Sequence, residues 1–487
     1  MNRKTIASFA IGPLGSALVG IVTLPMLAWF FAVDDIGRIS TLQVIISFSL
    51  LLFTLGLDQA YVREYHESVE IDLPNLLKIA MIPGLTLLLL ACVFILIFAP
   101  FALSNILFSI ESPVISILVS LCLVAAFFSR FLSLILRMEE RGVAYSMSQI
   151  LPNILFLILI ISFGVIVKNF DFNKLLIAQF VSILSVTIIL AWNTRFLLFR
   201  ALSSSIHWEK MQGMMKFGFP LIFGSVAYWA LMAMDKLFLR SMSTFEELGI
   251  YSVATSVAAS AGLLSGIFNI IWTPTVYKWA SNNLSTERID RIASHMLAMV
   301  SAIFIISGLF SWILQFILPS SYVKVQFIVT LCMAAPLFYT LSETTAVGIG
   351  ISRKSIFSMI ASVSAATINL IGNYILVPKL GAIGAAISTG VAIWLFLIMR
   401  TEFAHSVWRP MPRIKLYLVT AISLIIMIGF ALSTVDQRGP WLVIWGICSV
   451  LWVCLFRDSA VTSFQESKKI INELRSEILR FKGRFQE

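Results

Sequence analysis

Five charged side chains stand out because they interrupt or border long apolar segments. They are Asp235 and Lys236 in YWALMAMDKLFL, Arg130 in AAFFSRFLSLILR, Glu343 in YTLSETTAVG and Arg63 in YVREYHE. An ionisable side chain near the centre of a bilayer costs at least about 2.5–3.5 kcal/mol, so each is a candidate for a substrate or ion pathway. Arginine and lysine suit an anionic ligand, whereas the acids suit a partner cation or a coupling ion, a proton or sodium.

Enzymatic chemistry has little support elsewhere in the sequence. No phosphate-binding GxxxxGK[ST] motif is present, and the five cysteines fall inside apolar runs without metal-ligand spacing. The histidines lie in or near expected cytoplasmic loops, without a carboxylate or cysteine constellation beside them; they are His66, His207, His295 and His405. We therefore expect a protein that is not an enzyme and that uses no cofactor and no metal.

The composition places these charges in a membrane. The chain has 487 residues, of which 59% are hydrophobic and 12% charged, and its mean hydropathy is +0.94. A soluble protein with so little charge would expose large apolar surfaces and aggregate. The net charge of +10 arises from basic residues in short bursts between apolar runs, a pattern typical of membrane topology signals rather than of a nucleic-acid surface.

Apolar segments long enough to cross about 30 Å of hydrocarbon predict an all-α polytopic membrane protein with about fourteen spans. The connections between them are short, so no room remains for a soluble domain. The predicted spans are 7–31, 37–57, 76–101, 113–136, 143–167, 172–194, 214–239, 248–277, 293–318, 325–349, 354–377, 381–400, 414–434 and 440–456.

The loops predict the orientation. With a cytoplasmic N-terminus, about 26 lysines and arginines fall in cytoplasmic loops and the tail, against about 7 outside. The start, MNRKTIASFAIGPLG, has no cleavage site and reads as a retained first helix. Both termini are therefore expected in the cytoplasm.

Two motifs recur at a constant offset of 212 residues. DDIGRIS at 34–40 matches EELGIYS at 246–252, and YSM at 145–147 matches FSM at 357–359. The matches reflect either a coincidence between apolar segments or a duplicated six-helix unit. A duplication would give two lobes related by an axis along the membrane normal, able to rock about a central site.

We accordingly expect four regions in the chain. They are a first six-helix lobe (1–200), a second six-helix lobe (201–405), two extra transmembrane helices (406–457) and a basic cytoplasmic tail (458–487). The tail has an amphipathic pattern from 464 to 485, which predicts a helix that lies on the membrane surface or docks a partner.

Several stretches resemble a known family. GPLGS, LGLDQAYVREYHE, FGFPL, MAMDKLFL, LGIYSVA, WTPTVYK and GNYILVPKLGAIGAAIS are similar to sequences of the oligosaccharide (O-antigen repeat-unit) flippases, the polysaccharide branch of the multidrug/oligosaccharidyl-lipid/polysaccharide exporter superfamily. The resemblance covers roughly residues 1–400. It implies two pseudo-symmetric six-helix lobes around a central cavity, with alternating access, and two peripheral C-terminal helices.

The resemblance also implies a substrate and partners. The substrate would be an undecaprenyl-diphosphate-linked oligosaccharide of lipopolysaccharide or another surface polysaccharide, moved across the cell inner membrane. A polysaccharide polymerase and chain-length machinery are the implied protein partners. A lipid II flippase and a multidrug exporter share the fold and stay open as alternatives.

A diphosphate substrate gives the five charged residues roles. We expect Arg130 to capture the diphosphate near the cytoplasmic side and Lys236 to receive it near the outer side. Asp235 and Glu343 would hold these cations in the empty site, with Arg130 and Glu343 meeting across the cavity. Lys236 could instead snorkel outward beside Asp235, and Arg63 is either a third contact at the cytoplasmic mouth or a topology anchor.

Two asparagines inside predicted spans complete the candidates. Asn153 and Asn373 lie in the fifth and eleventh spans. They would either line the cavity and contact sugar or form hydrogen bonds between helices.

Overall fold

The computed structural model describes residues 3–65, 73–166, 171–204, 207–281, 287–352, 354 and 356–457, which contain helices and turns but no β-strand. The predicted all-α class is confirmed. A transmembrane chain must satisfy its backbone hydrogen bonds internally, and helices do so within one segment. The predicted tail, 458–487, lies outside the described residues.

The first half of the chain forms one bundle of helices. Its elements are α1 (Arg3–Phe30), α2 (Val33–Phe53), α3 (Leu57–Tyr65), α4 (Leu73–Phe98), α5 (Ala102–Phe108), α6 (Pro113–Met138), α7 (Gly142–Ile166), α8 (Phe172–Asn193) and α9 (Arg195–Ser203).

The second half contains the two longest helices and a second bundle. Its α-helices are α10 (Trp208–Met242), α11 (Phe245–Ser281), α12 (Glu287–Phe310), α13 (Leu314–Ile317), α14 (Val325–Cys332), α15 (Ala334–Thr345), α16 (Val347–Ile351), α17 (Ile356–Leu380), α18 (Ala382–Val407), α19 (Ile414–Ala431) and α20 (Arg438–Leu455).

The helices are long enough for a membrane protein. Within the described residues, twelve segments are both long and apolar enough to span a bilayer. α10 and α11, of 35 and 37 residues, are not among these twelve. The total of fourteen spans stays a prediction.

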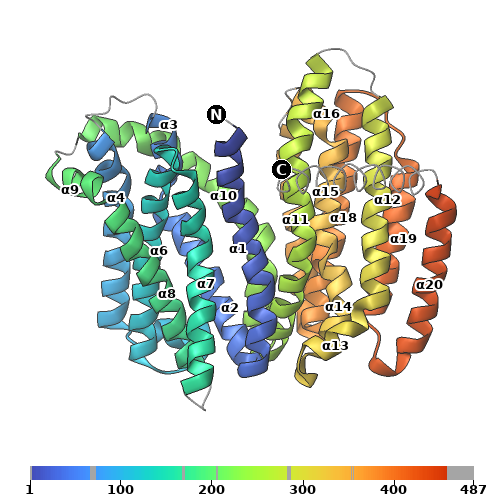
Figure 1. The fold of residues 1–487 in the computed structure, drawn as a ribbon, viewed down its shortest axis with the longest axis horizontal. Helices are drawn as coiled ribbons and strands as arrows, with labels where there is room; N and C mark the ends of the chain where they lie inside the picture. Colours follow the sequence, from blue (N-terminus) through green and yellow to red (C-terminus); the bar gives the residue numbers. More distant parts are fainter. Residues whose placement is uncertain are drawn as a thin grey trace, which may run out of the picture.

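The two bundles stand side by side (Figure 1), and α10 contacts both of them. It packs on α2 and α3 of the first bundle and on α17 and α18 of the second. α1 packs on α7 of its own bundle and on α11 of the other. Side chains on α10 are therefore placed between the bundles.

The offset of 212 residues reappears in the helix starts. α2 and α6 begin at Val33 and Pro113, and α11 and α14 begin at Phe245 and Val325, each pair 212 residues apart. This agreement in structure supports a duplicated unit rather than a chance match of two motifs.

The repeated motifs contact each other reciprocally. A Cβ added at Gly37 would overlap the carbonyl oxygen of Phe245, and one added at Gly249 would overlap the carbonyl oxygen of Val33. Both members of each pair are related by the 212-residue offset, so the contact is self-complementary, as at a two-fold interface. These two glycines let the starts of α2 and α11 approach closely at the end of the molecule opposite the N-terminus (Figure 1).

A second close approach involves the break between α2 and α3. Leu55 and Gly56 have positive φ values of 53° and 68°, which ends α2. A Cβ on Gly56 would overlap the carbonyl oxygen of Gly218 in α10. The break turns α3 against the first part of α10 and brings Asp58, in the first turn of α3, to a buried position.

Candidate functional site

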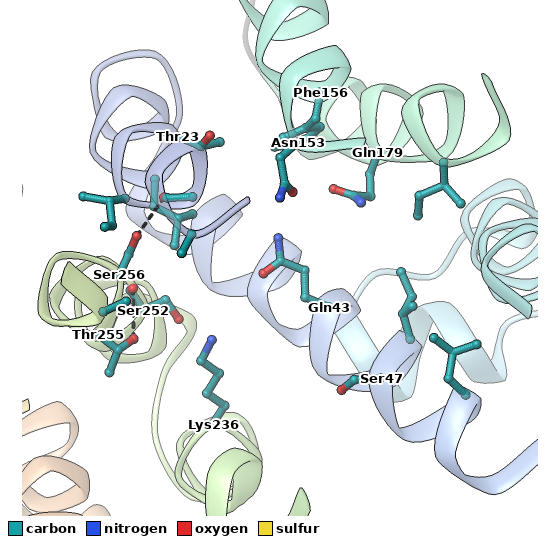
Figure 2. Close-up of a pocket in the computed structure, with 18 residues that line it drawn as sticks. Thr23, Gln43, Ser47, Asn153, Phe156, Gln179, Lys236, Ser252, Thr255 and Ser256 are labelled. Atoms are coloured by element: carbon teal, nitrogen blue, oxygen red, sulfur yellow. Dashed lines mark hydrogen bonds between the residues drawn. The ribbon is translucent and has the colours of Figure 1, made fainter. Parts of the chain in front are cut away.

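A central cavity of about 510 Å³ lies between the bundles. Its walls are α1, α2, α7 and α8 of the first bundle, together with α10 and α11. Its volume falls in the range typical of small-molecule sites. The polar residues that line it are Thr23, Gln43, Ser47, Asn153, Gln179, Lys236, Ser252, Thr255 and Ser256 (Figure 2).

Lys236 contributes a cation to this cavity. Its side chain extends from α10 toward Gln43 (Figure 2), so it points between the bundles rather than outward along the helix. Among the described residues, none forms a hydrogen bond or an ion pair with its ammonium group. The predicted resting pair of Lys236 with the Asp235 carboxylate is therefore absent from the ion pairs of the described chain.

Three primary amides face the same cavity from three helices. Gln43 belongs to α2, Asn153 to α7 and Gln179 to α8, and Figure 2 shows all three directed toward the same space. The Asn153 amide donates a hydrogen bond of 2.8 Å to Ser16 Oγ of α1. Asn153 thus serves both uses that the sequence left open, lining the cavity and joining two helices.

Arg130 lines a second cavity of about 300 Å³, which shares Ser47 and Leu50 with the central cavity. Its guanidinium lies 2.7 Å from the Asp58 carboxylate, and its side chain is 43% exposed while that of Asp58 is only 9% exposed. Both Nε and Nη2 of Arg130 donate to the same carboxylate oxygen. The remaining guanidinium donors face the cavity and are open to a ligand.

The predicted pairing of Arg130 with Glu343 is wrong. Glu343 is 2.6 Å from the guanidinium of Arg400, which also donates to Ser342 Oγ. Glu343 lines neither the central cavity nor the second one. Matched depth places two residues at the same level but does not turn them toward each other, and here each finds a nearer partner.

Asp235 points into the second bundle rather than into the central cavity. Its carboxylate, 4% exposed, accepts hydrogen bonds from Tyr251, Thr389, Asn369 and Asn373. The two asparagine bonds are 3.1 and 2.7 Å long. All four donors are uncharged, so the expectation that Asp235 holds Lys236 is wrong, and Asn373 forms the interhelical hydrogen bond that was one of its two expected uses.

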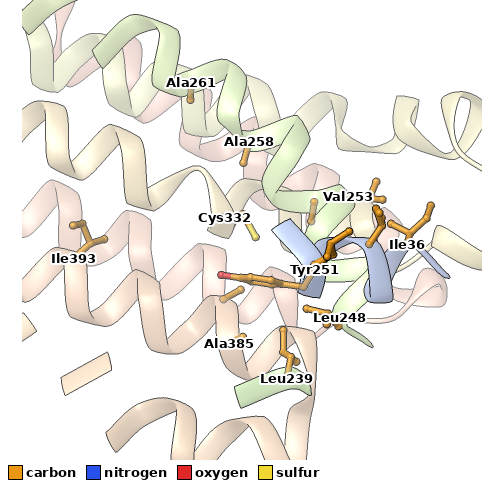
Figure 3. Close-up of a cluster of buried hydrophobic side chains, with 14 of the residues drawn as sticks. Ile36, Leu239, Leu248, Tyr251, Val253, Ala258, Ala261, Cys332, Ala385 and Ile393 are labelled. Carbon is orange, nitrogen blue, oxygen red and sulfur yellow. The ribbon is translucent and has the colours of Figure 1, made fainter. Parts of the chain in front are cut away.

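A third cavity, of about 360 Å³, adjoins this carboxylate and shares Thr255 and Ala259 with the central cavity. The ring of Tyr251 is packed among apolar side chains, including Ile36 from the first bundle (Figure 3). The tyrosine therefore links the Asp235 cluster to the contact between α2 and α11.

Arg63 lies apart from the cavities. Its guanidinium is stacked 4.5 Å from the centre of the Phe217 ring of α10. Among the residues that line the three cavities, Arg63 does not appear. This position suits an anchor between α3 and α10 and leaves its predicted ligand role untested.

A family model described as polysaccharide biosynthesis protein matches residues 3–283, which is more than half of the chain. The chain belongs to this family. No curated protein matches it significantly.

Solved structures identify the fold of this family member. "Lipid II flippase MurJ, inward closed conformation" is similar with a TM-score of 0.64 at 15% identity, over 92% of this chain and 99% of that one. An inward-facing multidrug resistance MATE family transporter of the MOP superfamily gives a TM-score of 0.51 at 16% identity, over 81% of this chain and 94% of that one. The chain has a transporter fold related to those of MurJ and MATE proteins.

Several polar residues of the family member had no predicted role. Asp58 follows the apolar run of α2 and reads as the start of a loop, although the break at Leu55 and Gly56 turns it inward. Gln43 and Gln179 each stand alone within an apolar segment, where hydropathy averaging hides them. Their signal was available, because a glutamine inside a membrane span requires a polar partner or a cavity.

Proposed function

We propose that this protein is a flippase that moves prenyl-diphosphate-linked oligosaccharide repeat units of an O-antigen or a similar surface polysaccharide across the inner membrane. The observation that carries the proposal is that Arg130 and Lys236 line two adjoining cavities between helices. A diphosphate cannot enter hydrocarbon without compensating charges and hydrogen bonds. Successive cations along one polar path supply that compensation.

Arg130 is the entry contact in this proposal. Its planar guanidinium suits phosphate oxygens, and its exposed donors are presented to the second cavity while Asp58 fixes its orientation. Because one side of the guanidinium is already bonded to Asp58, the arriving diphosphate binds the other side without leaving the aspartate uncompensated.

Lys236 is the next contact, and the reciprocal glycine contact closes the far end of the path. With a cytoplasmic N-terminus, the starts of α2 and α11 form the outer end, where Gly37 and Gly249 allow close packing. Rocking of the two bundles about α10 would part this contact and open the central cavity outward. The substrate then leaves Lys236 on the outer side.

Asp235 is the proposed coupling site, for a proton or a sodium ion. It is buried, and the third cavity beside it adjoins the central cavity through Thr255 and Ala259. A carboxylate with only uncharged donors can accept a proton or share a small cation with the neighbouring amide and hydroxyl oxygens.

The cavity chemistry distinguishes the alternatives. The residues lining the central cavity include Lys236 but no aspartate or glutamate, which is unfavourable for a multidrug exporter of cationic compounds. A lipid II flippase handles a related prenyl diphosphate, and its fold is similar to this one. The family assignment favours a polysaccharide precursor over lipid II. In this proposal the chain catalyses no covalent step and delivers its product to a polysaccharide polymerase with its chain-length machinery.

The test is genetic. Deletion of the gene should cause prenyl-diphosphate-linked repeat units to accumulate on the cytoplasmic face, and the intact gene should restore export. Arg130→Ala should fail to restore it at normal protein levels, whereas Arg137→Ala, a matched change of an exposed arginine on the same helix, should restore it. Unchanged polysaccharide and unchanged lipid-linked intermediates in the deletion strain would refute the proposed function.

A further inference from the structure

The amides of Gln43 and Gln179 are exposed to the central cavity without partners among the described residues. Gln43 lies near the middle of α2, and Gln179 lies on α8 across the cavity (Figure 2). Each sits in a segment apolar enough to span a membrane. Unpaired amides are costly at membrane depth unless they face water or a ligand, so their placement around one cavity indicates a binding surface.

The chemistry of this surface differs from that of the cations. A primary amide offers two donors and a carbonyl acceptor, whereas lysine and arginine only donate. A sugar hydroxyl both donates and accepts, so an amide is a complementary partner for it. Asn153 uses one donor on Ser16 and keeps its carbonyl oxygen and its second N–H for a ligand.

The surface is also placed opposite a cation. In Figure 2 the three amides occupy α2, α7 and α8, while Lys236 extends from α10 into the same space. Hydroxyl groups of Ser252, Thr255 and Ser256 lie on the α11 wall. A ligand with an anionic group beside uncharged hydroxyls would contact both kinds of surface at once.

We propose that Gln43, Asn153 and Gln179 form a sugar-binding subsite, which holds hydroxyl groups of the sugars next to the diphosphate when the diphosphate lies at Lys236. This inference rests on the proposed function and adds a division of labour to it. The cations recognise the diphosphate that every prenyl-linked substrate carries. The amides recognise the sugar, and so determine which repeat unit is accepted.

The experiment compares two probes on the purified full chain in nanodiscs. One probe is undecaprenyl diphosphate, and the other is undecaprenyl diphosphate that carries the host's own repeat unit. The wild type should bind the glycosylated probe more tightly. Gln43→Leu and Gln179→Leu should each weaken that binding by roughly 3- to 10-fold, as expected for a lost hydrogen bond, and leave binding of plain undecaprenyl diphosphate unchanged.

Two further variants make the result specific. Asn193→Leu removes an amide from the other end of α8, outside the three cavities, and should bind both probes like the wild type. Gln43→Asn keeps a donor and an acceptor on a shorter side chain and should recover part of the lost affinity. Preserved binding of plain undecaprenyl diphosphate shows that each variant is folded.

The outcomes separate this inference from the proposed function. If the glutamine variants bind the glycosylated probe as tightly as the wild type does, or lose both probes equally, the sugar-binding subsite is refuted. If the wild type binds neither probe, the proposed function itself fails.

Discussion

Gly249 is the position where a single methyl group should shift the protein between its two proposed conformations. A Cβ at Gly249 would overlap the carbonyl oxygen of Val33 and lie 2.9 Å from its Cγ1 and 3.1 Å from its carbonyl carbon. Ordinary contacts between carbon atoms are about 3.5–4.0 Å, so the starts of α2 and α11 must separate by about 0.5–1 Å. Gly249→Ala therefore penalises the closed outer end and not the open one.

The size of the effect follows from overpacking. Inserting a methyl group into a tightly packed contact costs typically about 1–3 kcal/mol. If that penalty falls on the closed state alone, the equilibrium shifts toward the open state by about 5- to 150-fold. Gly37→Ala should act in the same direction, because Gly37 makes the equivalent contact with Phe245.

Thiol labelling from outside intact cells measures this shift. Ser256→Cys places a thiol in the wall of the central cavity, in a background where the five natural cysteines are replaced. A membrane-impermeant reagent should label it faster when Gly249→Ala is added. Gly266→Ala is the matched control, because it lies on the same helix and a Cβ there meets nothing within 4 Å.

Two results would refute this reasoning. Equal labelling rates for Gly249→Ala and Gly266→Ala would show that the glycine contact does not control access. Faster labelling only in inside-out vesicles would show that the contact closes the cytoplasmic end, and the predicted orientation would be reversed.

The remaining predictions concern the charged groups. Arg130→Lys should restore export only partly in the deletion strain, because an ammonium keeps the charge but loses the planar fork, and export equal to the wild type would show that charge alone suffices. Asp235→Asn should abolish the dependence of translocation on a proton or sodium gradient in proteoliposomes, and an unaltered gradient dependence would exclude Asp235 as the coupling site. Glu343→Ala should lower thermal stability in detergent by about 2 kcal/mol, because it leaves the buried Arg400 without its partner, and a melting temperature equal to that of the wild type would contradict this role.

The sequence predicted the helices well for a physical reason. A bilayer requires about 20 apolar residues for each crossing and satisfies backbone hydrogen bonds only in closed structures, so hydropathy alone locates most elements. Twelve described segments meet this requirement. The 212-residue offset also carried real information, since it relates Val33 to Phe245 and Pro113 to Val325 at helix starts.

The charge partners were not predictable in the same way. Depth in a span fixes only the position along a helix axis, whereas pairing also depends on helix rotation and on local breaks. Arg130 meets Asp58 because α2 ends at Leu55 and Gly56, and Asp235 and Lys236 face different cavities although they are adjacent in sequence. Consecutive helical residues diverge by about 100°, so a charged pair in sequence is not a pair in space.

Translocation in proteoliposomes tests the central claim most directly. Purified protein would be reconstituted with the host's prenyl-diphosphate-linked repeat unit, under proton and sodium gradients, and the fraction of the lipid reachable by an external glycosidase would be followed with time. We predict that the wild type redistributes the lipid between leaflets, that Arg137→Ala does the same, and that Arg130→Ala matches protein-free vesicles. Redistribution by the wild type no faster than in protein-free vesicles would contradict the account.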